Sequence, residues 1–296
     1  MPDDLLKTKL FIPPARPGQV ARPQLMQKLE DGLQSGQRLT LVSAPPGFGK
    51  TTIITEWIAG YSNPQSAGLP APGSGRNVRF CWLALDEGDS DPIHFWRYLL
   101  TALQTAEPQL GEAELNALRS SQPPSLKALA SSLINDLSAI SSPLVLVLDD
   151  YHLISAKEVH ESLNFFLDHL PPQVHVVIVT RSDPPLQLAH RRGRGELNEI
   201  RAADLRFTSQ EAIAFFNESM KLGLSAGDIS ALEQRTEGWI VGMQLAALSL
   251  QGISDKHSLV DAFSGDDRYI ADYLVEEVLN RQPQPIQDFL LKTSVL

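Results

Sequence analysis

Short apolar runs alternate with segments of helical periodicity over the first two thirds of the chain. Five of these runs are predicted to form strands, and the longer ones are apolar enough to be buried on both faces. They are RLTLVS at 38–43, VRFCWLALD at 78–86, PLVLVLDD at 143–150, VHVVIVT at 174–180 and LNEIR at 197–201. Strands of this kind, separated by helices, predict an α/β fold in which a parallel sheet lies between two layers of helices.

The segments between the runs repeat their apolar residues with the period of a helix. The helices predicted in this way cover 23–33, 51–60, 93–106, 126–140 and 159–170. The acidic run Asp86–Asp91 is expected to cap the helix that begins near Pro92. Between Tyr61 and Arg76 a stretch rich in Gly, Pro and Ser indicates a surface loop, either a tolerated insertion or a lid.

The character of the chain changes after Arg206, where only helical patterns follow. Thr208 and Glu211 form a capping box that opens one helix, and Ser225 begins a second, which ends at Gly238. Further helices are predicted at 239–250 and 267–279, and another begins at Pro285. The predicted organisation is a P-loop α/β domain at 1–205, a small all-helical domain at 206–283 and the start of a truncated winged-helix domain at 284–296.

Composition and charge exclude several classes of protein. The formal net charge of -10 argues against these residues forming a DNA-binding surface. The single cysteine, Cys81, rules out a disulfide framework, and the N-terminus lacks the pattern of a signal peptide. No apolar stretch approaches membrane-spanning length. We therefore expect a cytoplasmic location without a membrane partner.

The most informative motif is SAPPGFGKTT, which follows the first strand and opens a helix. Gly47 and Gly49 let the backbone turn so that its N–H groups meet phosphates. Lys50 supplies a charge for the β- and γ-phosphates, and the Thr51 hydroxyl is suited to ligate Mg²⁺. Ala44 replaces the usual first glycine, which is acceptable where its φ is negative. The motif predicts a nucleotide-binding loop.

Acidic and basic residues follow two later strands. Asp149 ends the run LVLVLDD and is predicted to hold Mg²⁺ beside the loop. Asp150 either orients an attacking water or caps the next helix. Arg181 follows VHVVIVT and either reaches the γ-phosphate or pairs with Asp183 or Asp150.

Two weaker features carry no assigned role. The cluster His190–Arg194 is expected to be a solvated charged edge, with phosphate or partner binding as the alternative. His152 has no companion at metal-ligand spacing, so the only metal expected is Mg²⁺.

Six segments in order resemble one family over nearly the whole chain. The segments are SAPPGFGKTT, WLALDEGDSDPIHFWRYL, LVLVLDDYHLI, IVTRSDPPL, IRAADLRFTSQEA and TEGWIVGMQLAALSL. They resemble the MalT-like family of large ATP-binding regulators of the LuxR type, which belongs to the STAND class of signal-transduction ATPases. That family combines a nucleotide-binding domain, a helical domain, a winged-helix domain, a helical-repeat sensor and a C-terminal DNA-binding domain.

The resemblance implies an ATP/ADP switch in a signal-responsive transcriptional activator. Slow Mg²⁺-dependent hydrolysis would reset the switch, and the ATP-bound full-length protein would self-associate. DNA and a small-molecule or protein inducer would be bound only by domains that lie outside these 296 residues.

The resemblance also implies a set of site residues. Lys50, Asp149, Asp150 and Arg181 would act in hydrolysis, with Arg181 reading the γ-phosphate, and Thr51 and Asp149 would hold Mg²⁺. The implied nucleotide contacts are Val20, Arg22, Pro46, Gly47, Phe48, Gly49, Lys50, Thr51, Thr52, Gly238, Trp239 and Ile240.

Two parts of this set are specific to the nucleotide base. The linker around Val20 and Arg22 would pack against adenine and ribose. Ile240 replaces a proline that commonly contacts the adenine ring in this class, and Trp239 is either a base contact or a core aromatic.

Two other classes of P-loop protein remain as alternatives. A small-molecule kinase would need lid arginines, for which Arg191, Arg192 and Arg194 are the candidates. An AAA-type motor would depend on an arginine from a neighbouring subunit for rapid turnover.

Overall fold

The computed structural model of the chain describes residues 5–15, 18–62, 77–253, 255–262, 268–280 and 284–287. Most of the loop predicted between Tyr61 and Arg76 therefore lies outside the described residues, as does most of the predicted segment 284–296. Contacts divide the chain into two compact units. The first comprises Met1–Arg16, Arg22–Ala44 and Lys50–Asp204, and the second Pro17–Ala21, Pro45–Gly49 and Leu205–Leu296.

The first unit is built on a parallel sheet. Its strands are β1 (Leu39–Ser43), β2 (Arg79–Ala84), β3 (Leu144–Asp149), β4 (Val174–Thr180) and β5 (Leu197–Arg201). Their order is β2-β3-β4-β1-β5, and every neighbouring pair is parallel. All five predicted strands are confirmed. Because the strands are parallel, their carboxyl ends share one edge of the sheet, where the site residues lie.

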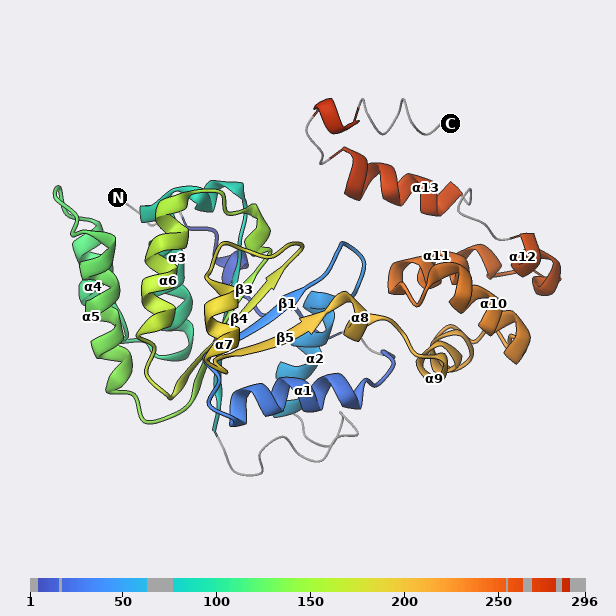
Figure 1. Cartoon of the computed structure of the whole chain (residues 1–296), viewed down its shortest axis with the longest axis horizontal. Helices are drawn as coiled ribbons and strands as arrows, with labels where there is room; N and C mark the ends of the chain where they lie inside the picture. The colour runs from blue at the N-terminus through green and yellow to red at the C-terminus, as the bar shows by residue number, and fades with distance from the viewer. Residues whose placement is uncertain are drawn as a thin grey trace. The chain divides into compact units, whose positions relative to one another are not determined.

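Helices cover both faces of this sheet, which confirms the predicted α/β class. The α-helices are α1 (Pro23–Gln34), α2 (Lys50–Ser62), α3 (Pro92–Ala106), α4 (Glu112–Leu118), α5 (Leu126–Ser138), α6 (Lys157–Asp168), α7 (Leu188–Gly193) and α8 (Ala202–Leu205). Three short 3₁₀ turns are η1 (Lys7–Leu10), η2 (Glu87–Ser90) and η3 (Tyr151–Leu153). Helices α3 to α6 lie on one side of the strands, and α1 and α2 lie on the other (Figure 1).

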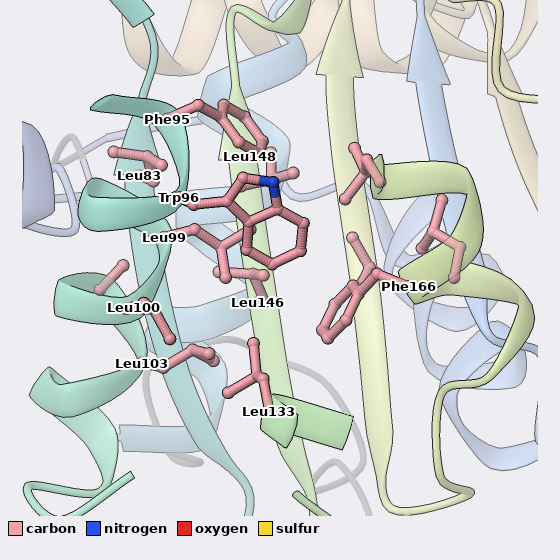
Figure 2. Close-up of a cluster of buried hydrophobic side chains, with 14 of the residues drawn as sticks. Leu83, Phe95, Trp96, Leu99, Leu100, Leu103, Leu133, Leu146, Leu148 and Phe166 are labelled. Carbon is pink, nitrogen blue, oxygen red and sulfur yellow. The ribbon is translucent and has the colours of Figure 1, made fainter. Parts of the chain in front are cut away.

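Alternate residues of each strand enter a different layer of the core. In β3, Leu146 and Leu148 meet the side chains of α3, including Phe95 and Trp96 (Figure 2). The Trp96 indole is fully buried and donates to Ser162 Oγ of α6 at 3.0 Å. The acids before α3 act as caps, as predicted, since the Asp91 carboxylate accepts the backbone N–H of His94 at 2.8 Å. This apolar layer makes the sheet rigid enough to fix residues at its edge.

The second unit is helical throughout its described part after α8, which confirms the predicted helical domain class. Its elements are α9 (Ser209–Ile213), a π-helix η4 (Ala214–Ser219), α10 (Ala226–Thr236), α11 (Ile240–Leu250), α12 (Lys256–Ala262), α13 (Arg268–Leu274) and a π-helix η5 (Val275–Leu279). Thr208 and Glu211 form the predicted capping box, and Ser225 caps α10. None of the helices in the described ranges is long and apolar enough to cross a membrane.

A polar network interrupts the apolar layer on the α1 side of the sheet. His175 Nε2 shares a hydrogen bond with Thr40 Oγ1 at 2.8 Å, and His175 Nδ1 bonds to the Gln37 carbonyl at 2.7 Å. Asn198 Nδ2 donates to the Lys28 carbonyl at 2.9 Å. Burial lowers the pKa of His175 to about 4, so the imidazole is neutral at neutral pH.

This network predicts a specific acid sensitivity. The His175 pKa lies below its ordinary value of 6.5, so His175 stabilises the fold above pH 6.5 and this contribution is lost as the pH falls towards 4. The loss amounts to about 3 kcal/mol. We expect His175→Gln to be less stable than the wild type at pH 7 and to lose less stability on acidification. Urea unfolding at pH 7 and pH 4.5 measures both; parallel losses in the two proteins would refute the assignment.

Candidate nucleotide-binding site

The loop between β1 and α2 has the backbone expected of a phosphate-binding loop. Gly47 and Gly49 have φ values of 80° and 73°, which glycine adopts without steric cost. Ala44 has no positive φ and donates its N–H to the Thr180 carbonyl at 3.3 Å, which continues the ladder between β1 and β4. The condition under which Ala44 replaces glycine is therefore met.

Asp149 lies at the carboxyl end of β3 and meets the first turn of α2. Thr51 Oγ1 donates to Asp149 Oδ2 at 3.0 Å and lies 3.2 Å from Oδ1. The Asp149 side chain is buried, and this burial raises its pKa to about 6, helped by the nearby charge of Asp150. A buried carboxylate beside a hydroxyl forms a set of hard oxygen donors that fits Mg²⁺.

Lys50 brings the opposite charge to the same place. Its side chain is buried, and this burial, helped by the charge of Arg181, lowers the pKa of Lys50 to about 8. The carboxylates of Asp150 and Asp149 raise it in opposition. The structure thus collects Lys50, Thr51, Asp149, Asp150 and Arg181 at one edge of the sheet in the first unit.

Asp150 has an unusual backbone conformation. Its φ of 56° is left-handed, which is costly for a residue other than glycine, and its N–H donates to Asp149 Oδ1 at 3.0 Å. Although Asp150 precedes η3, its side chain makes no capping hydrogen bond. The structure therefore does not support the alternative that Asp150 serves as a helix cap.

Asp183, which the sequence offered as a partner for Arg181, forms hydrogen bonds with two other residues. Its carboxylate accepts from Ser43 Oγ at 3.2 Å and from Arg201 Nη2 at 3.2 Å. The bond with Arg201 is the main cause that lowers the pKa of Asp183. Arg181 lies near enough to Lys50 for its charge to lower the lysine pKa, as described above.

The basic cluster His190–Arg194 is not a uniformly solvated edge, so this expectation was wrong for one of its members. Arg191 is fully buried, donates to the Leu186 carbonyl at 3.1 Å and lies 3.0 Å from an Asp168 oxygen. Arg192 and Arg194 form ion pairs with Glu199 and Glu196. Of the three lid candidates, Arg191 is therefore part of the fold, whereas Arg192 and Arg194 remain exposed at the surface.

Within the second unit, the loop Pro45–Gly49 contacts the start of α11. Trp239 Nε1 donates to the Pro46 carbonyl at 3.1 Å, and the Val241 N–H donates to the Gly47 carbonyl at 3.2 Å. A Cβ placed on Gly49 would lie 3.0 Å from Ile240 Cδ1. The structure thus brings Pro46, Gly47 and Gly49 together with Trp239 and Ile240.

Gly238 has a structural role of its own. Its φ of 70° follows the left-handed Glu237 that ends α10, and its carbonyl accepts the Phe207 N–H at 2.9 Å. A Cβ on Gly238 would lie 2.8 Å from the Phe207 carbonyl oxygen, so no larger residue fits.

Val20, another of the implied nucleotide contacts, packs on the apolar cluster of the second unit.

Arg22 and the remaining loop residues belong to other local environments. Arg22 is buried in the first unit, 3.4 Å from the Asp204 carbonyl, and its charge opposes the raised pKa of Glu56. Thr52 lies in the first turn of α2, where its carbonyl accepts the Thr55 hydroxyl at 2.9 Å, and Phe48 is half-buried in the loop. The parts of the chain that the structure describes contain no cluster of three or more His, Cys, Asp or Glu side chains suited to a metal.

Sequence reasoning missed Val241. Its contribution is a backbone N–H, which every residue except proline carries, so no side-chain pattern marks it. The flanking Trp239 and Ile240 were noticed only through the family resemblance.

The sheet order, the glycine-rich loop and the Lys50–Asp149 edge define the P-loop NTPase class of fold. Residues 20–179 match the family model described as the AAA ATPase domain, and the chain belongs to that family.

Relatives extend the similarity over the whole chain. The HTH-type transcriptional regulators MalT of Serratia proteamaculans and Klebsiella pneumoniae are 36% and 35% identical to it, over 99% of this chain in each case. The chain spans about a third of their length, 30% and 31% respectively.

Solved structures show the same fold at low sequence identity. A Signal Transduction ATPase with Numerous Domains from Pyrococcus horikoshii, which has a tetratricopeptide repeat sensor, aligns with a TM-score of 0.55 at 16% identity. The alignment covers 96% of this chain and 35% of that one. Aeropyrum pernix ORC1 aligns with a TM-score of 0.51 at 15% identity, over 100% of this chain and 75% of that one.

The buried carboxylate predicts a stabilising substitution. The pKa of Asp149 is raised from 3.8 to about 6, so ionisation of this carboxyl group destabilises the folded state. The folded state loses this stability progressively as the pH rises from about 4 to about 6. We expect Asp149→Asn without nucleotide or Mg²⁺ to be more stable than the wild type at pH 8, on the order of 2 kcal/mol. The gain should shrink towards pH 4 in thermal unfolding curves. A variant destabilised at pH 8 would contradict the conclusion that ionising this buried carboxylate costs stability.

The close packing of the loop predicts the cost of a methyl group. A Cβ on Gly47 would lie 2.7 Å from Trp239 Nε1 and 2.9 Å from Val241 Cβ, at a φ of 80°. Gly36 has a φ of 74° with no atom within 4 Å of its Cβ position, so Gly36→Ala carries only the torsional cost of about 1–2 kcal/mol. We expect Gly47→Ala to be destabilised further in urea unfolding. Equal losses of stability in the two variants would show that the Trp239 and Val241 side chains move aside without an energetic cost.

Proposed function

We propose that the chain is the nucleotide-binding switch module of a signal-responsive transcriptional activator and that it distinguishes ATP from ADP. The observation that carries this proposal is the contact of Thr51 with the buried Asp149 carboxylate, next to the buried ammonium of Lys50. Membership of the AAA ATPase domain family and similarity to MalT regulators support it.

The phosphates would bind to the loop Pro46–Gly49 and to Lys50. The Lys50 pKa of about 8 keeps the ammonium largely charged at neutral pH, although burial disfavours this charged form. A bound polyanion would favour the charged form, so we expect the site to attract phosphate. Thr52, in the first turn of α2, would add its backbone N–H to the same group.

Mg²⁺ would be held by the Thr51 hydroxyl and the Asp149 carboxylate. Both are hard oxygen donors, and the raised pKa of Asp149 reflects a charge that lacks full solvation. When bound, Mg²⁺ would neutralise charge on the β- and γ-phosphates. A pKa of about 6 for Asp149 means that protonation competes with the metal in mildly acidic solution.

Asp150 and Arg181 would act at the γ-phosphate. The Asp150 side chain makes no capping hydrogen bond. The backbone of Asp150 is left-handed, so the chain leaves the extended conformation of β3 at this residue. We assign it to orienting the attacking water and accepting its proton. Arg181 would place positive charge at the γ-phosphate, since its charge already acts on Lys50.

The switch follows from the difference between the two nucleotides. A ligand shifts a conformational equilibrium only through its differential affinity for the two states. The γ-phosphate supplies that difference, because Lys50, Arg181 and Mg²⁺ would contact it in ATP and lose it in ADP. Slow hydrolysis would return the protein to its ADP-bound form.

The partners of the complete protein belong to the same proposal. Since this chain spans about 30% of the length of its MalT relatives, we assign inducer and DNA binding to other parts of the full-length protein. The ATP-bound form would self-associate. The net charge of -10 argues against DNA contact by these residues.

We expect Lys50→Ala to lose nucleotide affinity by about 10- to 100-fold, because a charge-assisted hydrogen bond to phosphate is removed. The measurement is the nucleotide that co-purifies with the chain, released by denaturation and identified by ion-exchange chromatography. Lys157→Ala is the matched control, since Lys157 is exposed on α6 and forms an ion pair with the exposed Glu161.

Stoichiometric ADP in the wild type and in Lys157→Ala, absent from Lys50→Ala, would support the switch. An empty wild-type site that turns over ATP rapidly would overturn it. Activity rising with protein concentration would then indicate a motor, and phosphate transfer to a small molecule would indicate a kinase.

A further inference from the structure

Two hydrogen-bond donors at the start of α11 end on carbonyl groups of the glycine-rich loop, within the second unit. The Trp239 indole donates to Pro46, and the Val241 N–H donates to Gly47, at 3.1 and 3.2 Å. Two successive peptide groups of the loop are therefore tied to one turn of one helix.

These bonds fix the direction of two N–H groups. A trans peptide is planar and its N–H points away from its C=O, and the described residues contain no cis bond. The peptide with the Pro46 carbonyl also holds the Gly47 N–H, and the peptide with the Gly47 carbonyl holds the Phe48 N–H. Anchoring both carbonyls on α11 turns both N–H groups to the opposite side. Such N–H groups are the phosphate donors of a glycine-rich loop.

The indole is held in one place by close packing. A Cβ on Gly242 would lie 2.7 Å from Trp239 Cε3, and a Cβ on Gly47 would lie 2.7 Å from its Nε1. The Tyr273 ring packs against the indole at a centroid distance of 5.6 Å. Glycine at both flanking positions lets the ring approach the loop, so the donor reaches the Pro46 carbonyl directly.

We propose that Trp239 is a positioning residue for phosphate binding: by holding the Pro46 carbonyl it orients the loop N–H groups towards the phosphates, and it does not read the base. This inference rests on the proposed nucleotide binding. It differs from both roles that the sequence left open for Trp239, a base contact and a plain core aromatic.

The test compares ADP with pyrophosphate, which carries the phosphates without a base. Isothermal titration calorimetry gives the affinity of the wild type and of Trp239→Phe for each ligand. We expect both affinities to fall by the same factor, about fivefold, because one net hydrogen bond that orders the loop is lost. A base contact would weaken ADP alone, and a core aromatic would leave both affinities at the wild-type value; either result overturns the proposal.

The control is Trp96→Phe, which removes another indole hydrogen bond, to Ser162 Oγ, in the core of the first unit. We expect it to bind both ligands as the wild type does, although it unfolds at a lower temperature. If Trp239→Phe does not fold by circular dichroism, Trp239→Met removes the same N–H donor with a flexible apolar side chain. Wild-type protein that binds neither ligand defeats the proposed function. Wild-type binding of both, with Trp239→Phe unchanged or weakened for ADP alone, defeats only the assignment of Trp239.

Discussion

The main constraint on the first unit is that it buries two opposite charges, Lys50 and Asp149, at one edge of its sheet. Asp149 and Lys50 both lose water, and the pKa of each moves towards neutrality, to about 6 and about 8. Such displaced values show that burial of these charges costs stability, since the charged forms lose water. The apolar layers on both faces of β3 and β4 supply the stability that offsets this cost. The sheet thus holds two buried charges of opposite sign close to one another.

A single continuous stretch of chain belongs by its contacts to two units. Lys50 and Thr51 belong to the first unit, whereas the preceding residues Pro45–Gly49 belong to the second. The conformation of this loop has to meet two conditions. Its glycines must adopt positive φ, and its carbonyls must meet donors from α11. Glycine at Gly47 satisfies both, because the absent Cβ frees the torsion and leaves space for the indole.

Arginine residues of the first unit show why charge alone identifies no function. Arg191 stands in a basic run, yet it is fully buried and holds Asn164 and Asp168 of α6. Arg201 joins Asp183 with Glu199, whose pKa falls to about 2, mainly through its bond with Arg192. The pairs of Glu199 and Arg201 link β5 to α7 and to the segment that follows β4. The partner of a cation, which sequence does not specify, decides between structure and ligand binding.

Sequence by itself determined the strands, the main helices and the motif at Gly47–Thr51, because period, capping and turn chemistry are local properties. It also placed Asp149 at a strand end. Only the tertiary structure decided which groups meet: Thr51 with Asp149, Arg191 with Asp168, and Val241 with Gly47. It also decided the short helices α4 and α7 and the π-helical turn of η4. Such contacts join residues far apart in the chain, and a backbone donor leaves no side-chain signal, so one sequence cannot specify them.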